Sequence, residues 1–237
     1  MDEISPVLAL EQAHFTYPGG GPVFSGIDFA VAPGEFVLVT GPSGGGKSSL
    51  LRLLSLLDVP SAGRLLLDGE DAAAIRPEVF RRRVNHLQQT PVLQDGSIRS
   101  NLLLPFGLAV SRSEGPAAPD EAAMRKALDR MLLAGLDLDK NANECSVGQR
   151  QRLCLIRSLF LRPKALLLDE PVSALDPESA RVVMQEVERV NREDGVAVVC
   201  VTHHGYDAPA GSTHWEVVAG AVRQKGTVSA GSRESTG

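Results

Sequence analysis

The chain has 237 residues and a formal net charge of −5. This length supports one large domain with a sizeable core, and the acidic balance argues against a broad electrostatic grip on nucleic acid. Three cysteines without Cys-x-x-Cys spacing favour neither a disulfide framework nor a zinc site, and no stretch approaches the roughly 18 to 20 apolar residues of a membrane span.

The N-terminal part is predicted to be rich in β-structure. Residues 7–32 are strand-like on both sides of a Pro- and Gly-rich turn at residues 18–22, which favours an antiparallel hairpin. A further strand and turn over residues 64–69 continues this part. We therefore expect an antiparallel β subdomain at one edge of the molecule.

A glycine-rich loop interrupts this part of the chain at residues 41–48, whose sequence Gly-Pro-Ser-Gly-Gly-Gly-Lys-Ser fits G-x-x-x-x-G-K-[ST]. An apolar strand (residues 35–40) precedes it and a run of helix formers (residues 49–54) follows, as a phosphate-binding loop requires. An ordinary glycine-rich turn with an incidental Lys-Ser is the alternative, which this strand-loop-helix context disfavours.

Such a loop points backbone N–H groups and a helix N-terminus at the phosphates of a nucleotide. Lys47 would reach the β- and γ-phosphates, and the Ser48 hydroxyl would ligate Mg²⁺. The residues predicted to bind the nucleotide here are Gly41, Ser43, Gly44, Gly45, Gly46, Lys47, Ser48 and Ser49.

Beyond about Ser97 the hydrophobic pattern becomes helical. After a Pro-rich loop at residues 115–119, Met124, Leu128, Met131 and Leu132 fall on one face of a helix. Stripes of this kind mostly serve packing. We expect an α-helical subdomain over about residues 96–160.

Parallel-sheet character returns in two apolar runs, at residues 165–169 and 197–202. The first ends in Asp169 and Glu170, at the strand end where ligands bind in open parallel sheets. Asp169 would bind Mg²⁺ directly or through water, and Glu170 would orient or deprotonate an attacking water. Alone, such a pair often just begins a loop, but the upstream phosphate loop favours the functional interpretation.

These elements predict an α/β fold: a P-loop NTPase core with a mostly parallel sheet, an antiparallel β edge subdomain and an α-helical subdomain. The domain is expected over residues 1–225. Residues 226–237, rich in Gly, Ser and Thr, are predicted to form a disordered tail.

Residues 145–152, Cys-Ser-Val-Gly-Gln-Arg-Gln-Arg, lie between the phosphate loop and the Asp-Glu pair. With them the chain resembles the nucleotide-binding domains of ABC (ATP-binding cassette) proteins, whose signature is L-S-G-G-Q-x-Q-R. The resemblance extends from about residue 7 to residue 220, with the motifs in family order. It is to small bacterial ATPases that work with a separate permease, iron and metal exporters among them.

The signature departs from the family pattern at two positions, Cys145 for leucine and Val147 for the first glycine. The residues Ser146, Gly148 and Gln149 are kept, and the resemblance implies that they bind the ATP held by a second copy. Since the hydroxyl and the helix N-terminus bind the phosphate, function is expected to survive. Val147 is expected to affect how closely the backbone approaches, and hence the rate.

The resemblance implies roles for four further residues. Tyr17 would stack on adenine, and Gln89 would contact Mg²⁺ or the attacking water and sense the transmembrane partner, with Gln88 as the alternative. Asp176 would lie in the loop between paired domains, and His203 would contact the γ-phosphate. Taken singly, each has a plainer interpretation: an aromatic that packs in the hairpin, a solvated glutamine, or a structural histidine.

The expected protein is thus the ATP-binding and ATP-hydrolysing subunit of a membrane transporter, with ATP and Mg²⁺ as ligands. The resemblance implies a homodimer that closes on two ATP molecules, and a transmembrane permease on a separate chain that docks near residues 93–102. An ordinary amphipathic helix is the alternative for that stretch. We expect a cytoplasmic location, peripheral on the inner face of the cell membrane, and no nucleic-acid partner.

Two other functions would also use a phosphate-binding loop. A soluble mechanical ATPase of the same superfamily, acting on nucleic acid or the ribosome, predicts a coiled-coil arm, zinc-binding cysteines, a strongly basic composition or two cassettes, none of which is evident in the sequence. In a P-loop kinase a small molecule accepts the phosphoryl group, and the signature and His203 argue against that.

Overall fold

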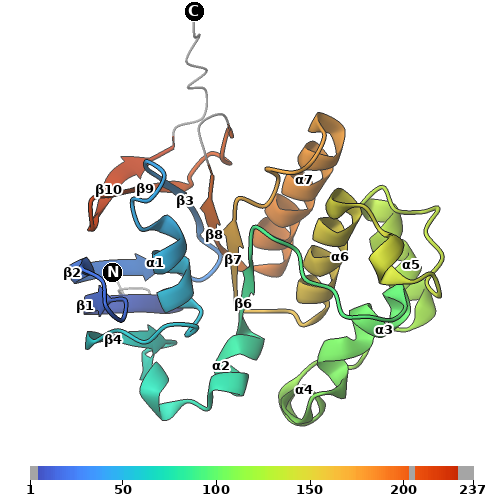
Figure 1. The fold of residues 1–237 in the computed structure, drawn as a ribbon, viewed down its shortest axis with the longest axis horizontal. Helices are drawn as coiled ribbons and strands as arrows, with labels where there is room; N and C mark the ends of the chain where they lie inside the picture. Colours follow the sequence, from blue (N-terminus) through green and yellow to red (C-terminus); the bar gives the residue numbers. More distant parts are fainter. Residues whose placement is uncertain (1–4, 203–205, 229–237) are drawn as a thin grey trace, which may run out of the picture.

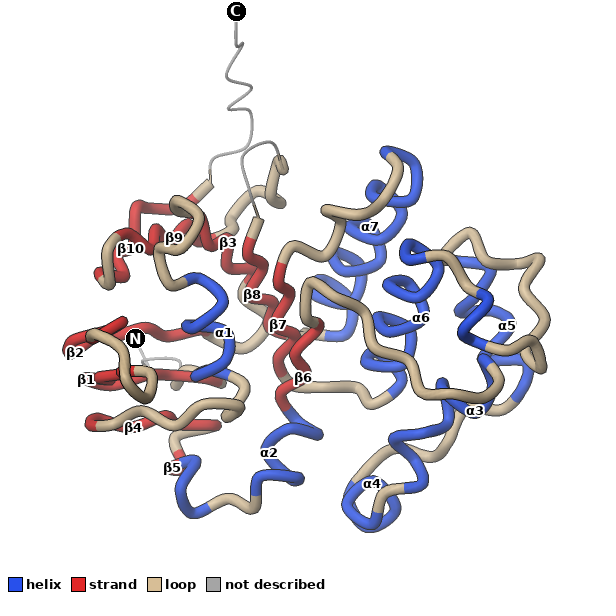
Figure 2. The backbone as a smooth tube through the Cα atoms, viewed as in Figure 1, coloured by secondary structure: helices blue, strands red, loops and turns tan. Residues whose placement is uncertain are grey.

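The computed structural model describes residues 5–202 and 206–228. Two β-sheets and a group of helices make up the molecule, with the antiparallel sheet on one side and helices α3 to α6 on the other (Figures 1 and 2). The predicted α/β fold, with a mostly parallel sheet, an antiparallel edge and a helical part, is confirmed.

The antiparallel sheet has the strand order β2-β1-β4-β5. Its strands are β1 (Leu8–Thr16), β2 (Pro22–Val31), β4 (Ala62–Leu67) and β5 (Glu70–Asp71). The predicted hairpin is confirmed, because β1 and β2 pair on either side of the turn at residues 18–22. Buried Phe15, Phe24 and Phe29 pack into the core beneath this sheet.

The second sheet has the order β10-β9-β3-β8-β7-β6 and is parallel except for the β9–β10 pair. Its strands are β3 (Phe36–Thr40), β6 (Val84–Leu87), β7 (Ala165–Asp169), β8 (Ala197–Val201), β9 (Thr213–Val218) and β10 (Ala221–Thr227). Strand β10 includes Gly226 and Thr227, which are the first two residues of the predicted tail.

Alternation of side chains along the central strands creates two cores, one on each face of this sheet. Leu167 of β7 and Val199 of β8 pack with α1 and the antiparallel sheet. Their neighbours Leu166, Val198 and Cys200 pack with α6 and α7 on the opposite face. Burial on both faces explains why these strands are continuous apolar runs in the sequence.

The helices are α1 (Lys47–Leu54), α2 (Pro77–Arg83), α3 (Ile98–Leu103), α4 (Ala109–Glu114), α5 (Glu121–Arg130), α6 (Val147–Phe160) and α7 (Pro177–Asp194). Short 3-10 helices are η1 (Ala72–Ala74), η2 (Leu104–Gly107) and η3 (Ala142–Glu144). No helix in residues 5–202 and 206–228 has the length and apolar character needed to cross a membrane.

The prediction that Leu132 packs in the core is wrong. Met124, Leu128 and Met131 are buried as expected, but Leu132 is 47% exposed. Helix α5 has ended by then, and Leu132 has a left-handed backbone with φ of 53°. The N–H groups of Leu132 and Leu133 donate to the carbonyls of Asp129 and Leu128, the hydrogen-bond pattern of a Schellman C-cap. This cap turns Leu132 outward and Leu133 inward.

Candidate functional site

The glycine-rich loop connects β3 to α1 and lies against other strands. Gly41 has φ of 144°, and a Cβ atom there would lie 2.1 Å from the Val217 carbonyl oxygen of β9. Gly46 caps α1 with φ of 108° and faces the Phe24 ring, which a Cβ would approach to 3.1 Å. Only glycine fits both the backbone conformation and the space at these two positions.

Lys47 is a buried cation at the start of α1, with 6% of its surface exposed. Its Nζ donates to the carbonyl oxygens of Gly41 and Pro42, at 2.8 and 2.9 Å. These carbonyls satisfy two donors but carry no full negative charge. The ammonium and the N-terminus of α1 therefore create a positive potential in the loop, which favours an anion.

A cavity of about 310 Å³ opens beside this loop. Tyr17 forms one wall, with its hydroxyl 3.1 Å from Ser49 Oγ and its ring edge-on to Phe15 at a centroid distance of 4.7 Å. The lining residues come from the hairpin, the loop, α1 and the segment after β7: Tyr17, Val23, Ser43, Gly44, Gly46, Lys47, Ser48, Ser49 and Glu170.

The two carboxylates at the end of β7 have different surroundings. Asp169 is buried as the last residue of the strand. Glu170 follows with a left-handed backbone, φ 49°, and its N–H donates to the Val201 carbonyl of β8 at 3.0 Å. Gln89 Nε2 donates to Glu170 Oε2 at 2.9 Å. Gln89 and Glu170, distant in sequence, thus meet where β6 and β7 end.

Oxygen atoms suited to Mg²⁺ are present in this region. Ser48 contributes a hydroxyl, Asp169 a carboxylate and Gln89 an amide carbonyl, which are the hard donors that this ion prefers. The predicted metal-binding residues therefore fit the ion by their chemistry.

The signature segment begins α6 with a capping box. Ser146 is the N-cap residue, and its Oγ accepts a hydrogen bond from the Gln149 N–H at 3.2 Å. Gln149 Oε1 accepts in return from the Ser146 N–H at 2.9 Å. The Gln149 side chain is thus engaged in the cap, while Ser146 is exposed and its hydroxyl proton stays available to a ligand. Val147 is 47% exposed beside it.

Gly148 lies against the loop that precedes α7. A Cβ atom at this position would lie 3.0 Å from Leu175 Cδ2. Asp176, which follows Leu175 in the chain, caps α7, because its Oδ1 accepts a hydrogen bond from the Ser179 N–H at 2.9 Å. Hydrogen bonds from Ser179 lower the pKa of the Asp176 carboxyl. The structure thus places the signature and the Asp176 loop next to each other.

The signature and the phosphate loop lie on opposite faces of the parallel sheet. Helix α1 packs in one core and α6 in the other, and the two are separated by the parallel strands in Figure 1. None of Gln89, Ser146, Gly148, Gln149 and Asp176 is among the described residues that line the 310 Å³ cavity. His203 lies outside the described residues.

Two residues to which the sequence analysis gives no role join the signature helix to its surroundings. Gln151 is buried, and its Nε2 donates to the Pro171 carbonyl at 2.6 Å, next to Glu170. Arg152 is also buried and donates to the Met131 carbonyl at 2.8 Å. The available signal was their place at the end of the signature segment, residues 145–152.

A larger cavity lies in another part of the molecule. A cavity of about 660 Å³ lies between α5, α6 and α7, with Met131, Phe160 and Arg189 among its lining residues. The smaller cavity at the glycine-rich loop brings together a buried cation, helix N–H groups and a carboxylate. We therefore assign the candidate site to the smaller cavity.

Comparison with known proteins gives concordant results. A sequence profile described as "ABC transporter" matches residues 24–173. The chain is 39% identical over 203 residues to the probable iron export ATP-binding protein FetA of Escherichia coli (strain K12), covering 86% of this chain and 87% of that protein. It is also 39% identical over 208 residues to the lipoprotein-releasing system ATP-binding protein LolD 2 of Caulobacter vibrioides, covering 84% and 89%.

Among solved structures, the chain is similar to a dimeric post-hydrolysis state of the ATP-binding cassette MJ0796 bound to ADP and Pi. The TM-score is 0.77 at 27% sequence identity, with 92% of this chain and 98% of that chain covered. The likeness therefore extends over the sheets, the helical part and the segments that carry the candidate site.

Proposed function

Since this chain belongs to the ABC transporter family, as an ATP-binding subunit, we propose that two copies of it close on ATP and that hydrolysis between them drives a separate membrane-spanning partner. The observation that carries the proposal is the cavity in which Tyr17, Lys47, Ser48 and Glu170 meet. Its wall supplies an aromatic ring for the base, a cation and N–H groups for the phosphates, and a carboxylate for the chemistry.

The residues of the cavity have distinct tasks in ATP hydrolysis. Lys47 and the N-terminus of α1 neutralise the β- and γ-phosphates, and the Tyr17 ring stacks on adenine. Glu170 accepts a proton from the water that attacks the γ-phosphorus, as the bond to ADP breaks. The hydrogen bond from Gln89 to Glu170 supports a role for Gln89 in orienting that carboxylate.

Mg²⁺ is the metal ion that we propose for this site. Ser48, Asp169 and Gln89 would hold it, and it would neutralise charge on the phosphate oxygens when bound. Removal of divalent ions with a chelator is expected to abolish hydrolysis.

The position of the signature supports a homodimer. Ser146 lies on the helix that packs on the face of the sheet opposite α1, so it is badly placed to reach the phosphate loop of its own chain. In a head-to-tail pair, the Ser146 hydroxyl and the N-terminus of α6 would donate to the γ-phosphate of the facing copy. The similarity to a dimeric cassette bound to ADP and Pi supports this arrangement.

A membrane partner is supported by apolar surface near Gln89. Leu57, Val59 and Val92 are exposed. A cavity of about 280 Å³, with Leu57, Gln88 and Arg157 among its lining residues, lies between α1, α2, β6 and α6. In the predicted docking stretch 93–102, Ile98 and Leu102 are buried, so we place the partner over Val92 and this cavity rather than on α3.

The decisive variant is Glu170→Gln, which keeps the shape of the side chain but removes the base. We expect it to bind ATP, to hydrolyse it at least about a hundredfold more slowly, and to accumulate as an ATP-dependent dimer. Phosphate release and size-exclusion chromatography measure these effects. The exposed Glu70→Gln variant should behave like the unmodified protein. Unchanged turnover by Glu170→Gln would show that Glu170 is not the base.

Copurification separates the transporter proposal from a soluble mechanical ATPase. The proposal expects an integral membrane protein to copurify with Glu170→Gln in ATP from detergent-solubilised cells. Recovery of nucleic acid or ribosomes instead would favour the alternative.

A further inference from the structure

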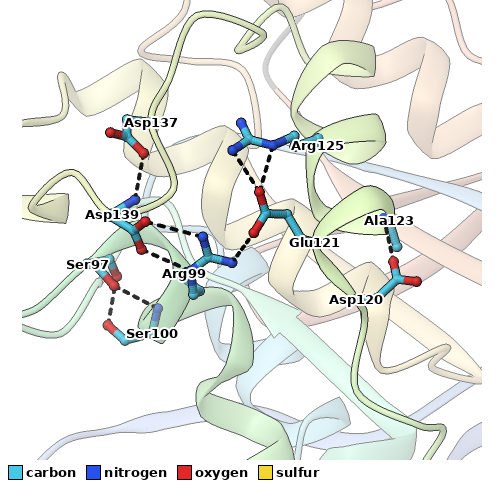
Figure 3. A network of polar contacts seen from close by, with 9 residues as sticks. All are labelled: Ser97, Arg99, Ser100, Asp120, Glu121, Ala123, Arg125, Asp137 and Asp139. Atoms are coloured by element: carbon cyan, nitrogen blue, oxygen red, sulfur yellow. Dashed lines mark hydrogen bonds and ion pairs between the residues drawn. The ribbon is translucent and has the colours of Figure 1, made fainter.

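Arg99 joins three separate segments of the helical part of the molecule (Figure 3). It lies in the first turn of α3, and its guanidinium contacts Asp139, in the loop before η3, and Glu121, in the first turn of α5. Nε and Nη2 are 2.9 and 3.3 Å from the two Asp139 oxygens, and Nη1 is 2.9 Å from Glu121 Oε2. This planar, forked geometry is specific to arginine.

The charges in this cluster favour one another. Hydrogen bonds to Asp139 and Glu121 raise the pKa of Arg99. Hydrogen bonds from Arg99 lower the pKa of Asp139, while those from Arg125 and then Arg99 lower the pKa of Glu121. Arg99, Asp139 and Glu121 are therefore charged near neutral pH, where their ion pairs can form.

The segments tied by Arg99 also pair through their backbones. Residues 96–99 and 138–142 form an isolated β-bridge, Ser97 with Asn141, flanked by hydrogen bonds of 2.7 to 3.0 Å from Arg99 to Leu138, from Ile98 to Lys140 and from Ala142 to Gly96. The Asn143 side chain donates to Asp95 at 2.9 Å. These contacts thus join the two segments into one unit.

This unit leads directly to the signature. After Ala142 the chain passes through η3 and the buried Cys145 to Ser146, the N-cap of α6. With Cys145 anchored in the core, little slack remains in the chain. A shift of residues 138–142 would therefore reach the N-cap of α6 through a short stretch of chain.

The unit is also joined to the segment that follows Gln89. The buried Asn101 side chain accepts from the Gln94 N–H at 2.7 Å and donates to the Gln94 carbonyl at 2.9 Å. The Val92 carbonyl accepts from Arg157 of α6 at 2.9 Å. A continuous set of hydrogen bonds thus runs from the Gln89 segment through α3 to the start of α6.

We propose that Arg99 is a positioning residue for Ser146: by holding residues 138–142 against α3 and α5, it fixes the direction in which the signature meets the ATP of a second copy. This inference depends on the proposed function, because Ser146 gains its ligand only when two copies close. Arg99 is not among the described residues that line the cavity at the phosphate loop, so its effect is expected on the closing step.

The test uses the full chain in the Glu170→Gln background and measures how much ATP half-maximal dimerisation requires. Arg99→Met is expected to raise that concentration about two- to fivefold, the range for loss of partly exposed ion pairs. Affinity of the monomer for a fluorescent ATP analogue, measured at a protein concentration too low for dimers, is expected to stay unchanged. Arg99→Lys should give an intermediate value, because an ammonium lacks the fork.

Two further variants separate positioning from general loss of stability. Arg192→Met removes an exposed ion pair within α7, outside this cluster, and should leave dimerisation unchanged. Exchange of the charges in Arg99→Asp with Asp139→Arg should restore part of the loss seen in Arg99→Asp alone. Should Arg99→Met melt much earlier than its parent, Arg99→Lys and the charge exchange provide the comparison.

The outcomes distinguish this inference from the function on which it depends. If Glu170→Gln dimerises with ATP and Arg99→Met requires no more ATP than its parent, or binds the analogue more weakly as a monomer, the inference is wrong. If Glu170→Gln alone does not dimerise, the proposed function fails, and the inference fails with it.

Discussion

At the scale of the residue, the signature shows how small changes control access to its backbone. A Cβ atom placed on Gly148 would lie 3.0 Å from Leu175 Cδ2, and the neighbouring Val147 is 47% exposed. An exposed Val147 leaves the N-terminus of α6 bordered by a branched side chain where the family pattern has none. Gly148 thus has little space for a side chain on the side that faces Leu175.

A methyl group at Gly148 tests this point. We expect Gly148→Ala to change the melting temperature little, because alanine favours the helix and Leu175 can shift. The ATP concentration for dimerisation in the Glu170→Gln background should rise on the order of tenfold, since the methyl would push Leu175 and the neighbouring Asp176 away from the signature.

The double variant Gly148→Ala with Leu175→Ala supplies the control. It removes the contact between the new methyl and the side chain at residue 175, so it should restore most of the normal dimerisation. Dimerisation that stays equally weak in the double variant would contradict a defect caused by displacement of Leu175.

At the scale of the element, helix caps serve both stability and function. Ser146 caps α6 and Asp176 caps α7, and both residues are also predicted to lie at the surface between two copies. A residue that caps a helix has its backbone and side chain held in place before any ligand binds. The caps thus prepare these polar groups for the closed dimer.

The cap of α7 makes stability depend on pH in a defined direction. Hydrogen bonds from Ser179 lower the pKa of Asp176 in the folded protein, so its carboxylate stabilises the fold above the unfolded pKa of about 4. This contribution is lost as pH falls through the lower folded pKa. Asp176→Ala should therefore melt a few degrees earlier at pH 7, with a difference that shrinks in acid.

Asp176→Asn is the matched variant, because asparagine also caps helices but does not titrate in this range. Asp176→Asn should melt at close to the temperature of the unmodified protein at pH 7. The stabilisation that its cap provides should be the same at pH 7 and at pH 3. A loss for Asp176→Ala that is equal at both pH values would contradict the assignment of this dependence to the carboxylate.

At the scale of the whole molecule, the two faces of the parallel sheet carry different halves of the proposed site. Lys47 and Glu170 line one cavity, whereas Ser146 begins a helix on the opposite face. In the proposed dimer, one chain would hold the nucleotide and the base, and the facing chain would supply the serine.

Mixing of inactive variants tests this division. Lys47→Ala and Ser146→Ala should each hydrolyse ATP poorly alone. A mixture should be several-fold more active than either, because a mixed dimer has one site with Lys47 from one chain and Ser146 from the other. Lys47→Ala mixed with Glu170→Gln should gain nothing, since these residues belong to the same cavity. Equal behaviour of both mixtures would contradict a shared site.

Short-range patterns allowed the sequence to predict several features correctly. The hairpin, the buried strands and the glycine-rich turn before α1 each depend on residues a few positions apart, so composition and spacing are sufficient. Even the departures Cys145 and Val147 were visible, although not their burial and exposure.

Only the tertiary structure decided which distant groups meet. The Gln89–Glu170 hydrogen bond joins residues 81 positions apart, and it exists because β6 and β7 are neighbours in the sheet. Separation of α1 and α6 onto opposite faces, and the tie between Arg99 and Asp139, likewise depend on strand order and helix packing. Such contacts follow from the global arrangement of elements, which local pattern does not specify.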